Sequence, residues 1–185
     1  GFAFKDFEGH FSEKRGFIFL GFIGLDSNRR PNTKQYIQML TKFGIKIRLL
    51  TAENFEMSKA LAIECGITDS EHSIMLDGKS FYEAIDGQLQ NDDIESSPTI
   101  NSVSRLVFNK HSFRRVENGL AVIGEARLID KYALVVGLNH SKSTTMYIGD
   151  SAIDTPSMKL VEIPVAYSSA STLAKDQAKC VLLED

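Results

Sequence analysis

Residues 146–156, with the sequence Met-Tyr-Ile-Gly-Asp-Ser-Ala-Ile-Asp-Thr-Pro, decide the fold. The pattern predicts a buried strand that ends in a tight Gly-Asp turn, followed by a second carboxylate. In a parallel α/β sheet, ligands bind at the carboxyl ends of the strands. Asp150 and Asp154 at that edge predict a Mg²⁺ site, because hard oxygen ligands suit this cation. A structural alternative is that Asp150 shapes the turn and Asp154 caps the next helix.

Composition limits the classes to which this 185-residue chain can belong. Its 43% of hydrophobic residues can form a core, and its formal charge of −3 argues against nucleic acid as a partner. No apolar run is long enough to cross a bilayer. Cys65 and Cys180 lie far apart, and we expect two reduced thiols. The chain begins at Gly1 without an initiator Met or a signal-peptide pattern, so we expect a piece of a longer protein.

Strand-like and helix-like segments alternate along most of the chain. The apolar run at residues 17–25 predicts a strand buried on both faces, as in parallel sheets covered by helices. The whole alternation predicts an α/β fold, a Rossmann-like parallel sheet flanked by helices. Residues from about 86 to 118 are more polar and predict a surface excursion. We interpret the basic cluster at residues 110–115, within that excursion, as a solvated face.

Polar side chains follow several of the predicted strands and begin one of the predicted helices. Thr51 and Glu53 follow a strand at residues 45–50, and Lys131 lies at a helix start. Because parallel strand ends converge at one edge, we expect these groups to meet the acids of residues 146–156. A hydroxyl can bind a phosphoryl oxygen, a lysine can offset developing charge, and carboxylates can hold Mg²⁺. The sequence therefore predicts a phosphoryl-transfer site.

Five segments, in the same order, resemble the phosphorylation domain of P-type cation-transporting ATPases, which belong to the haloacid-dehalogenase-like superfamily. These segments are 20–31 (LGFIGLDSNRRP), 51–67 (TAENFEMSKALAIECGI), 130–135 (DKYALV), 148–156 (IGDSAIDTP) and 171–185 (STLAKDQAKCVLLED). The Cys-Gly-Ile at residues 65–67 and the Gly-Lys-Ser-Phe turn at 78–81 most resemble the plasma-membrane-type calcium pumps. The resemblance implies the haloacid-dehalogenase-like fold.

The resemblance also implies roles for individual residues. The implied catalytic residues are Thr51 and Lys131, the implied phosphate-binding residues are Thr51, Ala52, Glu53, Lys131 and Gly149, and the implied metal site is Asp150 and Asp154. Thr51 would contact the phosphoryl group and Lys131 would neutralise its charge. Asp150 would be the Mg²⁺ ligand, with Asp154 supporting the same loop. Mg²⁺ is the implied cofactor, and ATP is the implied substrate of the intact protein.

The resemblance places the chain within a larger membrane protein. Residues 1–15 would connect from a nucleotide-binding domain, and residues 16–185 would form the phosphorylation domain, on the cytosolic side. The implied partners are the nucleotide-binding and actuator domains and the transmembrane helices of the same pump. This chain itself contains no transmembrane segment. The identity of the transported ion would depend on those helices.

The chain departs from the family at positions that matter for chemistry. The family's phosphorylated aspartate lies in a DKTGT motif, which is absent here, so we expect the sheet to lack the strand that carries it. Ala52 and Glu53 replace Gly and Asp of the family, and Ile153 replaces an Asn. A gapless alignment also places Glu125 where the family has an arginine.

Three functions remain open from the sequence. The first is the Mg²⁺- and phosphate-binding half of the phosphorylation domain of a cation pump, of the calcium type, which is inactive alone because the nucleophile is missing. The second is a catalytically degenerate, non-pumping relative, suggested by the four altered positions. The third is a free-standing phosphatase, for which Asp26 is the one candidate nucleophile at a strand end near the N-terminus.

Overall fold

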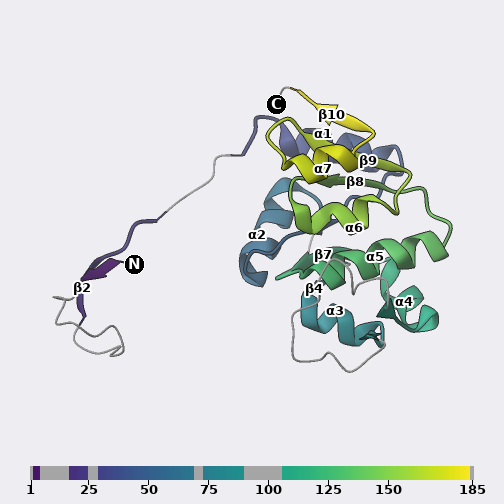
Figure 1. The fold of residues 1–185 in the computed structure, drawn as a ribbon, viewed down its shortest axis with the longest axis horizontal. Coiled ribbons are helices and arrows are strands. Elements are labelled where there is room, and N and C mark those ends of the chain that lie inside the picture. The colour runs from purple at the N-terminus through teal and green to yellow at the C-terminus, as the bar shows by residue number, and fades with distance from the viewer. Residues whose placement is uncertain (1, 5–16, 25–28, 69–72, 90–105, 184–185) are drawn as a thin grey trace. The chain divides into compact units, whose positions relative to one another are not determined.

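The computed structural model describes residues 2–4, 17–24, 29–68, 73–89 and 106–183 (Figure 1). Contacts divide the chain into two compact units, residues 1–33 and 34–185, which are described separately. The connector predicted at residues 1–15 and the candidate nucleophile Asp26 lie largely or wholly outside the described residues.

The first unit contains a pair of antiparallel strands, β1 (Phe2–Phe4) and β2 (Ile18–Gly21). Side chains of β2 are open to solvent, with Phe19 67% and Leu20 64% exposed. The prediction of a strand at residues 17–25 that is buried on both faces of a parallel sheet is therefore wrong. An apolar run reports a preference for burial, but burial on both faces also requires covering helices. Among the described residues of this unit, β2 has only β1 as a neighbouring element.

The second unit contains two parallel three-stranded sheets. One has the order β3-β7-β4 and the other β10-β9-β8. Their strands are β3 (Leu49–Leu50), β4 (Ile74–Asp77), β7 (Leu120–Gly124), β8 (Met146–Gly149), β9 (Ile163–Tyr167) and β10 (Cys180–Leu182). In Figure 1, β8, β9 and β10 lie in the upper part of this unit and β4 and β7 in the lower part. The predicted parallel α/β architecture is confirmed.

Helices follow the strands of the second unit, as expected for parallel connections. They are α1 (Thr33–Lys42), α2 (Phe55–Cys65), α3 (Gly78–Ala84), α4 (Lys110–Glu117), α5 (Leu128–His140), α6 (Thr155–Met158) and α7 (Thr172–Gln177), with a 3₁₀ turn at Ala152–Asp154. Gly66 ends α2 in the left-handed conformation (φ 77°), and its backbone N–H caps the helix, as its position in the sequence predicts. A short antiparallel pair, β5 (Gln88–Leu89) with β6 (Leu106–Val107), precedes α4.

Within the described residues, β3 and β8 each pair on one side only, β3 with β7 and β8 with β9. Each sheet therefore has two outer strands, β3 and β4 in one and β8 and β10 in the other, with one open edge each among the described residues. Met146 and Ile148 of β8 are 57% and 52% exposed, so this open outer strand also presents apolar side chains.

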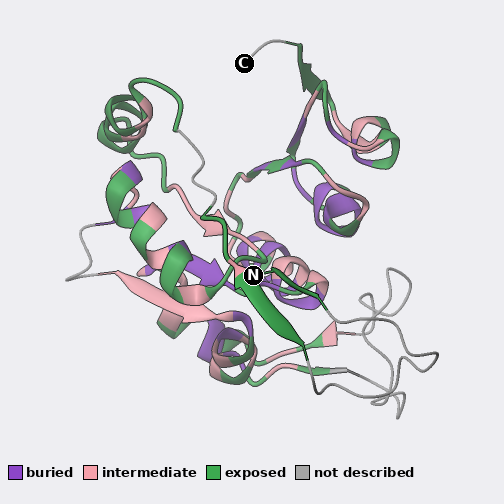
Figure 2. Cartoon of the chain, turned by 90° about the vertical axis from the view of Figure 1, so that its left-hand side faces the viewer, coloured by how far each residue is buried: buried purple, intermediate pink, exposed green. Residues whose placement is uncertain are grey.

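Helix α5 contributes to the core of both halves. Its Leu134 belongs to a buried cluster with Phe81, Phe113 and Ile123, while its neighbour Val135 belongs to a second cluster. That second cluster consists of Val135, Tyr147, Met158, Val161, Ala166, Ala170 and Ala174. The buried positions are purple in Figure 2. Every residue of β7 is buried, so β7 is the strand that is covered on both faces.

The described part of the predicted excursion at about 86–118 is more ordered than a surface loop. Helix α4 lies in it and buries Ser112 and Phe113. Residues 90–105 of this range lie outside the described part of the chain. The basic cluster at 110–115 is therefore carried on a helix that packs against the core.

Candidate functional site

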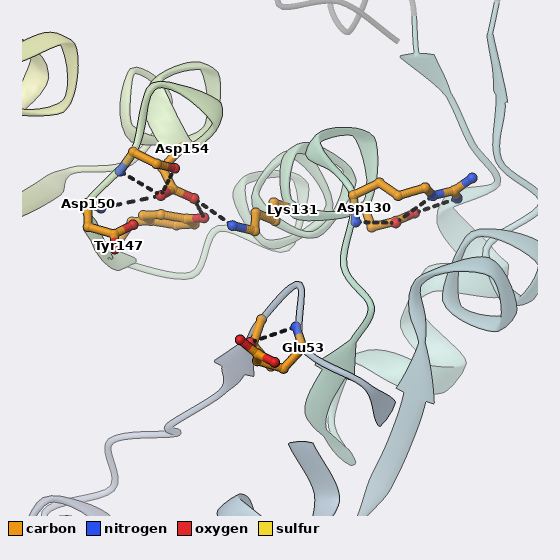
Figure 3. Close-up of polar contacts among 9 residues, drawn as sticks. Glu53, Asp130, Lys131, Tyr147, Asp150 and Asp154 are labelled. Carbon is orange, nitrogen blue, oxygen red and sulfur yellow. Dashed lines mark hydrogen bonds and ion pairs between the residues drawn. The ribbon is translucent and has the colours of Figure 1, made fainter. Parts of the chain in front are cut away.

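The predicted site residues lie at the ends of elements of the second unit. Thr51 follows β3, Lys131 lies in the first turn of α5, and Asp150 follows β8. Figure 3 shows Lys131 reaching from α5 to Asp154, while Asp130 points to the opposite side of the helix. Adjacent residues of α5 therefore serve different contacts, because successive side chains of a helix point in different directions.

Lys131 and Asp154 form a buried ion pair. The Nζ of Lys131 donates to Oδ1 of Asp154 at 2.8 Å, and the two side chains are only 12% and 4% exposed. Burial alone would raise the pKa of Asp154, but the hydrogen bond and charge of Lys131, with help from Ser151 and Tyr147, lower it to about 2. Asp154 is therefore a carboxylate at neutral pH, and it fixes the lysine at the start of α5.

Asp154 also organises the turn after β8. Its Oδ2 accepts hydrogen bonds from the backbone N–H of Asp150 at 3.3 Å and of Ser151 at 3.2 Å. The Ser151 hydroxyl donates to the same oxygen at 2.8 Å. Together with the bond from Lys131 to Oδ1, they engage both carboxylate oxygens with protein donors. The sequence predicts that Asp154 belongs to the metal site. In the described residues, its carboxylate holds the loop that carries Asp150.

Tyr147 is a part of this network that the sequence reasoning missed. Its hydroxyl donates to Oδ1 of Asp154 at 2.9 Å, and the side chain is buried. Burial, followed by the charge of Asp154, raises the pKa of Tyr147, so the phenol remains protonated and can donate. Alternation along β8 places residue 147 toward the core, and this was the available signal. A buried tyrosine usually needs a partner for its hydroxyl.

Asp150 is exposed in the turn after β8. Its backbone is fixed at both ends, because its N–H donates to Asp154 and its carbonyl accepts from the N–H of Ser171 at 2.8 Å. Within the described residues, no hydrogen bond or ion pair engages its side chain. Mg²⁺ is commonly held by one or two carboxylates together with waters and phosphate oxygens. A fixed, unengaged carboxylate fits one such ligand, and no group of three or more His, Cys, Asp or Glu side chains is found in the described part.

Thr51 and Glu53 form a compact turn after β3. The Thr51 hydroxyl accepts from the N–H of Glu53 at 3.1 Å, and the Thr51 carbonyl accepts from the N–H of Ala126 at 2.8 Å. Because the hydroxyl acts as an acceptor here, its proton is available to a ligand. Ala52 and Glu53 are exposed in the same turn. The predicted phosphate-contacting group is thus accessible.

Glu125 has a structural contact in this turn. It adopts a left-handed backbone conformation (φ 49°), and its Oε1 accepts from the N–H of Phe55 at 3.3 Å and from Nδ2 of Asn54 at 3.4 Å. The carboxylate therefore lies at the start of α2, where helix N–H groups favour a negative charge. Glu125 stands at a position where the resemblance implies an arginine.

Arg127 does not take the place of that arginine. Its guanidinium donates to both carboxylate oxygens of Asp130, at 2.8 and 2.9 Å, and lies 5.4 Å from the ring centre of Tyr82. Asp130 is completely buried, so this bidentate pair satisfies an otherwise costly charge. Arg127 thus pairs with Asp130, which points to the side of α5 away from Asp154 (Figure 3).

Gly149 is required by the packing of the turn. A Cβ at this position would lie 2.8 Å from both Cβ of Asp154 and Sδ of Met158. Glycine therefore allows β8 to approach α6 closely. Its predicted role at a phosphate remains a prediction.

Comparison with known proteins gives the relatives of the chain. No protein-family model matches the sequence. The chain is 27% identical over 190 residues to the plasma membrane-type calcium-transporting ATPase 2 of Arabidopsis thaliana, and 25% identical over 173 residues to ATPase 8 of the same type. The chain is similar to P-type calcium-transporting ATPases. The plasma membrane-type ATPase 7 of Oryza sativa subsp. japonica is 26% identical over 174 residues.

These P-type relatives are much longer than the chain. The matches cover 99% and 91% of the chain but only 16% and 14% of the Arabidopsis ATPases 2 and 8. Among solved structures, the catalytic domain of the CPx-ATPase CopB-B has a TM-score of 0.50 and 18% identity, over 83% of this chain and 40% of that one. This likeness agrees with the P-type ATPase fold. Of the described helices, none has the length and hydrophobicity of a membrane span.

Proposed function

We propose that the chain forms the Mg²⁺- and phosphate-binding half of the phosphorylation domain of an ATP-driven calcium pump. One observation carries the proposal, the Lys131–Asp154 pair that fixes a lysine beside the turn of the exposed Asp150. A fixed cation can offset the charge of a phosphate, and an unengaged carboxylate can bind the Mg²⁺ that accompanies it. The similarity to calcium-transporting ATPases over almost the whole chain supports the same function.

The chain's own residues would share the work at a bound phosphoryl group. The Thr51 hydroxyl would donate to a phosphoryl oxygen, and the Lys131 ammonium would offset its charge. Asp150 would be the protein ligand of Mg²⁺, and Asp154 would hold both Lys131 and the Asp150 turn in place. Mg²⁺, when bound, neutralises phosphate charge and orients the group for in-line transfer.

The positions of Thr51 and Asp150 suggest where the nucleophile of the intact protein belongs. These residues directly follow β3 and β8, each of which is an outer strand of its sheet. A parallel strand that joins β3 to β8 would end between these two residues. We propose that another part of the pump supplies this strand and the aspartate that accepts phosphate. The remaining partners would be nucleotide-binding and actuator domains and transmembrane helices, with this domain on the cytosolic face of the membrane.

An exchange experiment tests the proposal. The corresponding segment of a plasma-membrane-type calcium pump is replaced by this chain, and acid-stable phosphoenzyme formed from labelled ATP is measured. We expect phosphoenzyme that depends on calcium and Mg²⁺ and falls at least 100-fold with Asp150→Asn, by analogy with loss of one electrostatic group. Asp176→Asn, which changes an exposed aspartate of α7, is the matched control.

The isolated chain provides a second test. Because the proposed nucleophile is outside it, the chain alone should not hydrolyse ATP above a buffer blank. Turnover that disappears with Asp150→Ala would contradict the proposal and favour a free-standing phosphatase.

A degenerate relative of the pumps is the alternative, and the contacts of Glu125 and Arg127 favour it. A carboxylate at the start of α2 lies where an arginine is implied, and Arg127 is engaged by Asp130. Losing a cation at a phosphoryl site typically lowers the rate by orders of magnitude. In the exchange experiment, the triple variant Ala52→Gly, Glu53→Asp and Ile153→Asn separates the two functions. If phosphoenzyme forms only in the triple variant, the site of this chain is degenerate. If neither the unchanged chain nor the triple variant forms phosphoenzyme in a correctly targeted protein, the pump proposal is refuted.

A further inference from the structure

A second polar site lies at the far end of α5. A cavity of about 130 Å³ opens between α4 and the last turn of α5. Lys110 and Arg114 line it from α4, and His140 lines it from α5. At 1.5 Å per residue, the step of nine positions from Lys131 to His140 places it about 13.5 Å along the helix from the proposed phosphoryl site. The cavity is therefore separate from that site.

Aromatic rings form the apolar part of this cavity. Phe108 and Phe113 line it, with ring centres 5.7 Å apart, and the Phe108 ring lies 6.2 Å from the His140 ring, edge to face. Gly137 completes the wall, and a Cβ there would overlap the Phe113 ring. Phe113 is buried in the core, so these contacts give α4 and α5 a fixed separation. The cavity is built by packing rather than left by a loop.

The basic side chains that line the cavity are exposed to solvent. Among the described residues, Lys110, Arg114 and His140 form no hydrogen bond or ion pair. The neighbouring Arg115, in contrast, donates to Oγ of Ser112 at 3.0 Å. Lys110 and Arg114 are one turn apart on the same side of α4, where like charges repel. An anion between them would remove this repulsion.

The direction of α4 also makes the position of its first basic residue unfavourable. Lys110 lies in the first turn of α4, which contains no acidic residue, and cations are unfavourable at that end of a helix. The Ser141 hydroxyl at the cavity wall donates to Glu117 at 2.8 Å, so this carboxylate is already engaged by a donor. Glu117 does not itself line the cavity, and the charged side chains that do are Lys110 and Arg114.

We propose that this cavity binds a phosphoryl group, from free phosphate, a soluble phosphate ester or a lipid headgroup. A volume of 130 Å³ equals about four water molecules, enough for one such group. The planar guanidinium of Arg114 can donate two hydrogen bonds to adjacent phosphoryl oxygens, and Lys110 adds a point charge. The partly exposed ring of Phe108 would contact the apolar part of an ester. This inference does not depend on the proposed pump function.

Equilibrium dialysis of the 185-residue chain against labelled inorganic phosphate, without Mg²⁺, tests the proposal, and it does not require a monomeric protein. We expect saturable binding of one phosphate per chain, weakened about 10-fold by Arg114→Gln, as for loss of a charge-assisted hydrogen bond. Arg115→Gln makes the same change of charge on the adjacent residue and should leave the affinity within about 2-fold.

A second arm distinguishes the sources of the phosphoryl group. Vesicles of phosphatidylcholine with and without phosphatidic acid are sedimented with the chain. Retention that requires phosphatidic acid and Arg114 identifies a lipid headgroup, whereas Arg114-dependent dialysis without retention identifies a soluble phosphate compound. Circular dichroism verifies that Arg114→Gln is folded, and His140→Gln serves as a second variant. Absence of saturable binding in both arms, or equal loss with Arg115→Gln, overturns the proposal.

Discussion

Replacing Lys131 by methionine removes the cation that pairs with Asp154 while keeping most of the apolar stem. The Asp154 side chain is 4% exposed, so water cannot replace the ammonium. Removal of one partner from a buried ion pair costs about 3–5 kcal/mol, because the remaining charge is left without compensation. Asp154 would keep the donors Tyr147 and Ser151, at 2.9 and 2.8 Å, which places the expected cost at the lower end.

We therefore expect Lys131→Met to lower the free energy of unfolding by about 3 kcal/mol, roughly a 100-fold change in the unfolding equilibrium. Urea unfolding of the 185-residue chain, followed by circular dichroism, measures the loss. Lys159→Met is the matched control, because Lys159 is exposed and its side chain forms no hydrogen bond or ion pair among the described residues. It should change stability by less than about 0.5 kcal/mol.

A double-mutant cycle separates the ion pair from general effects of each substitution. Asp154→Asn in the Lys131→Met background should cost at least about 1 kcal/mol less than in the wild type, because the two residues are coupled. Additive effects, or a cost of Lys131→Met no larger than that of Lys159→Met, would refute the reasoning. In that case, the Lys131–Asp154 ion pair would not be what positions Asp150.

Three more predictions concern the region around β8. Tyr147→Phe removes a donor from Asp154 and should lower the free energy of unfolding by about 1 kcal/mol, in the same urea titration. Gly149→Ala places a methyl group against Asp154 and Met158, and this overpacking should cost about 1–3 kcal/mol by the same measurement. Ile148→Lys puts a charge on the open strand and should reduce self-association in analytical ultracentrifugation, because edge charges block pairing between sheets.

Matched variants control these three experiments. Tyr132→Phe removes a hydroxyl that has no hydrogen bond among the described residues, and Gly24→Ala adds a methyl group where no atom lies within 4 Å. Leu173→Lys changes an apolar side chain of similar exposure, 55% against 52% for Ile148, on a helix instead of a strand edge. If a control variant has the same effect as the test variant with which it is matched, the corresponding prediction is contradicted.

Much of the second unit follows from local sequence patterns. The run at residues 146–156 gives a strand, a tight turn and a second acid, and the structure places β8 and the 3₁₀ turn accordingly. Gly66 ends its helix because a residue without Cβ tolerates positive φ. These features depend on the backbone preferences of single residues and on the spacing of apolar residues. Both can be read from a short stretch of sequence.

Burial of the run at residues 17–25 could not be predicted in the same way. Its composition suits a strand covered on both faces, yet the described residues of β2 pair with β1 and remain exposed, whereas β7 is the strand that is fully buried. Which strand is covered depends on which helices pack on it. That information lies in contacts between distant parts of the chain.

The sequence by itself determined the α/β alternation, the acids after β8 and the lysine at the start of α5. Only the tertiary structure decided what each charge faces. Asp154 holds Lys131 and Tyr147, while Glu125 lies at the start of α2. The physical reason is that ion pairs and hydrogen bonds form only when the two groups lie a few ångströms apart. Partners 23 or 70 residues apart in the chain reach that distance only after folding.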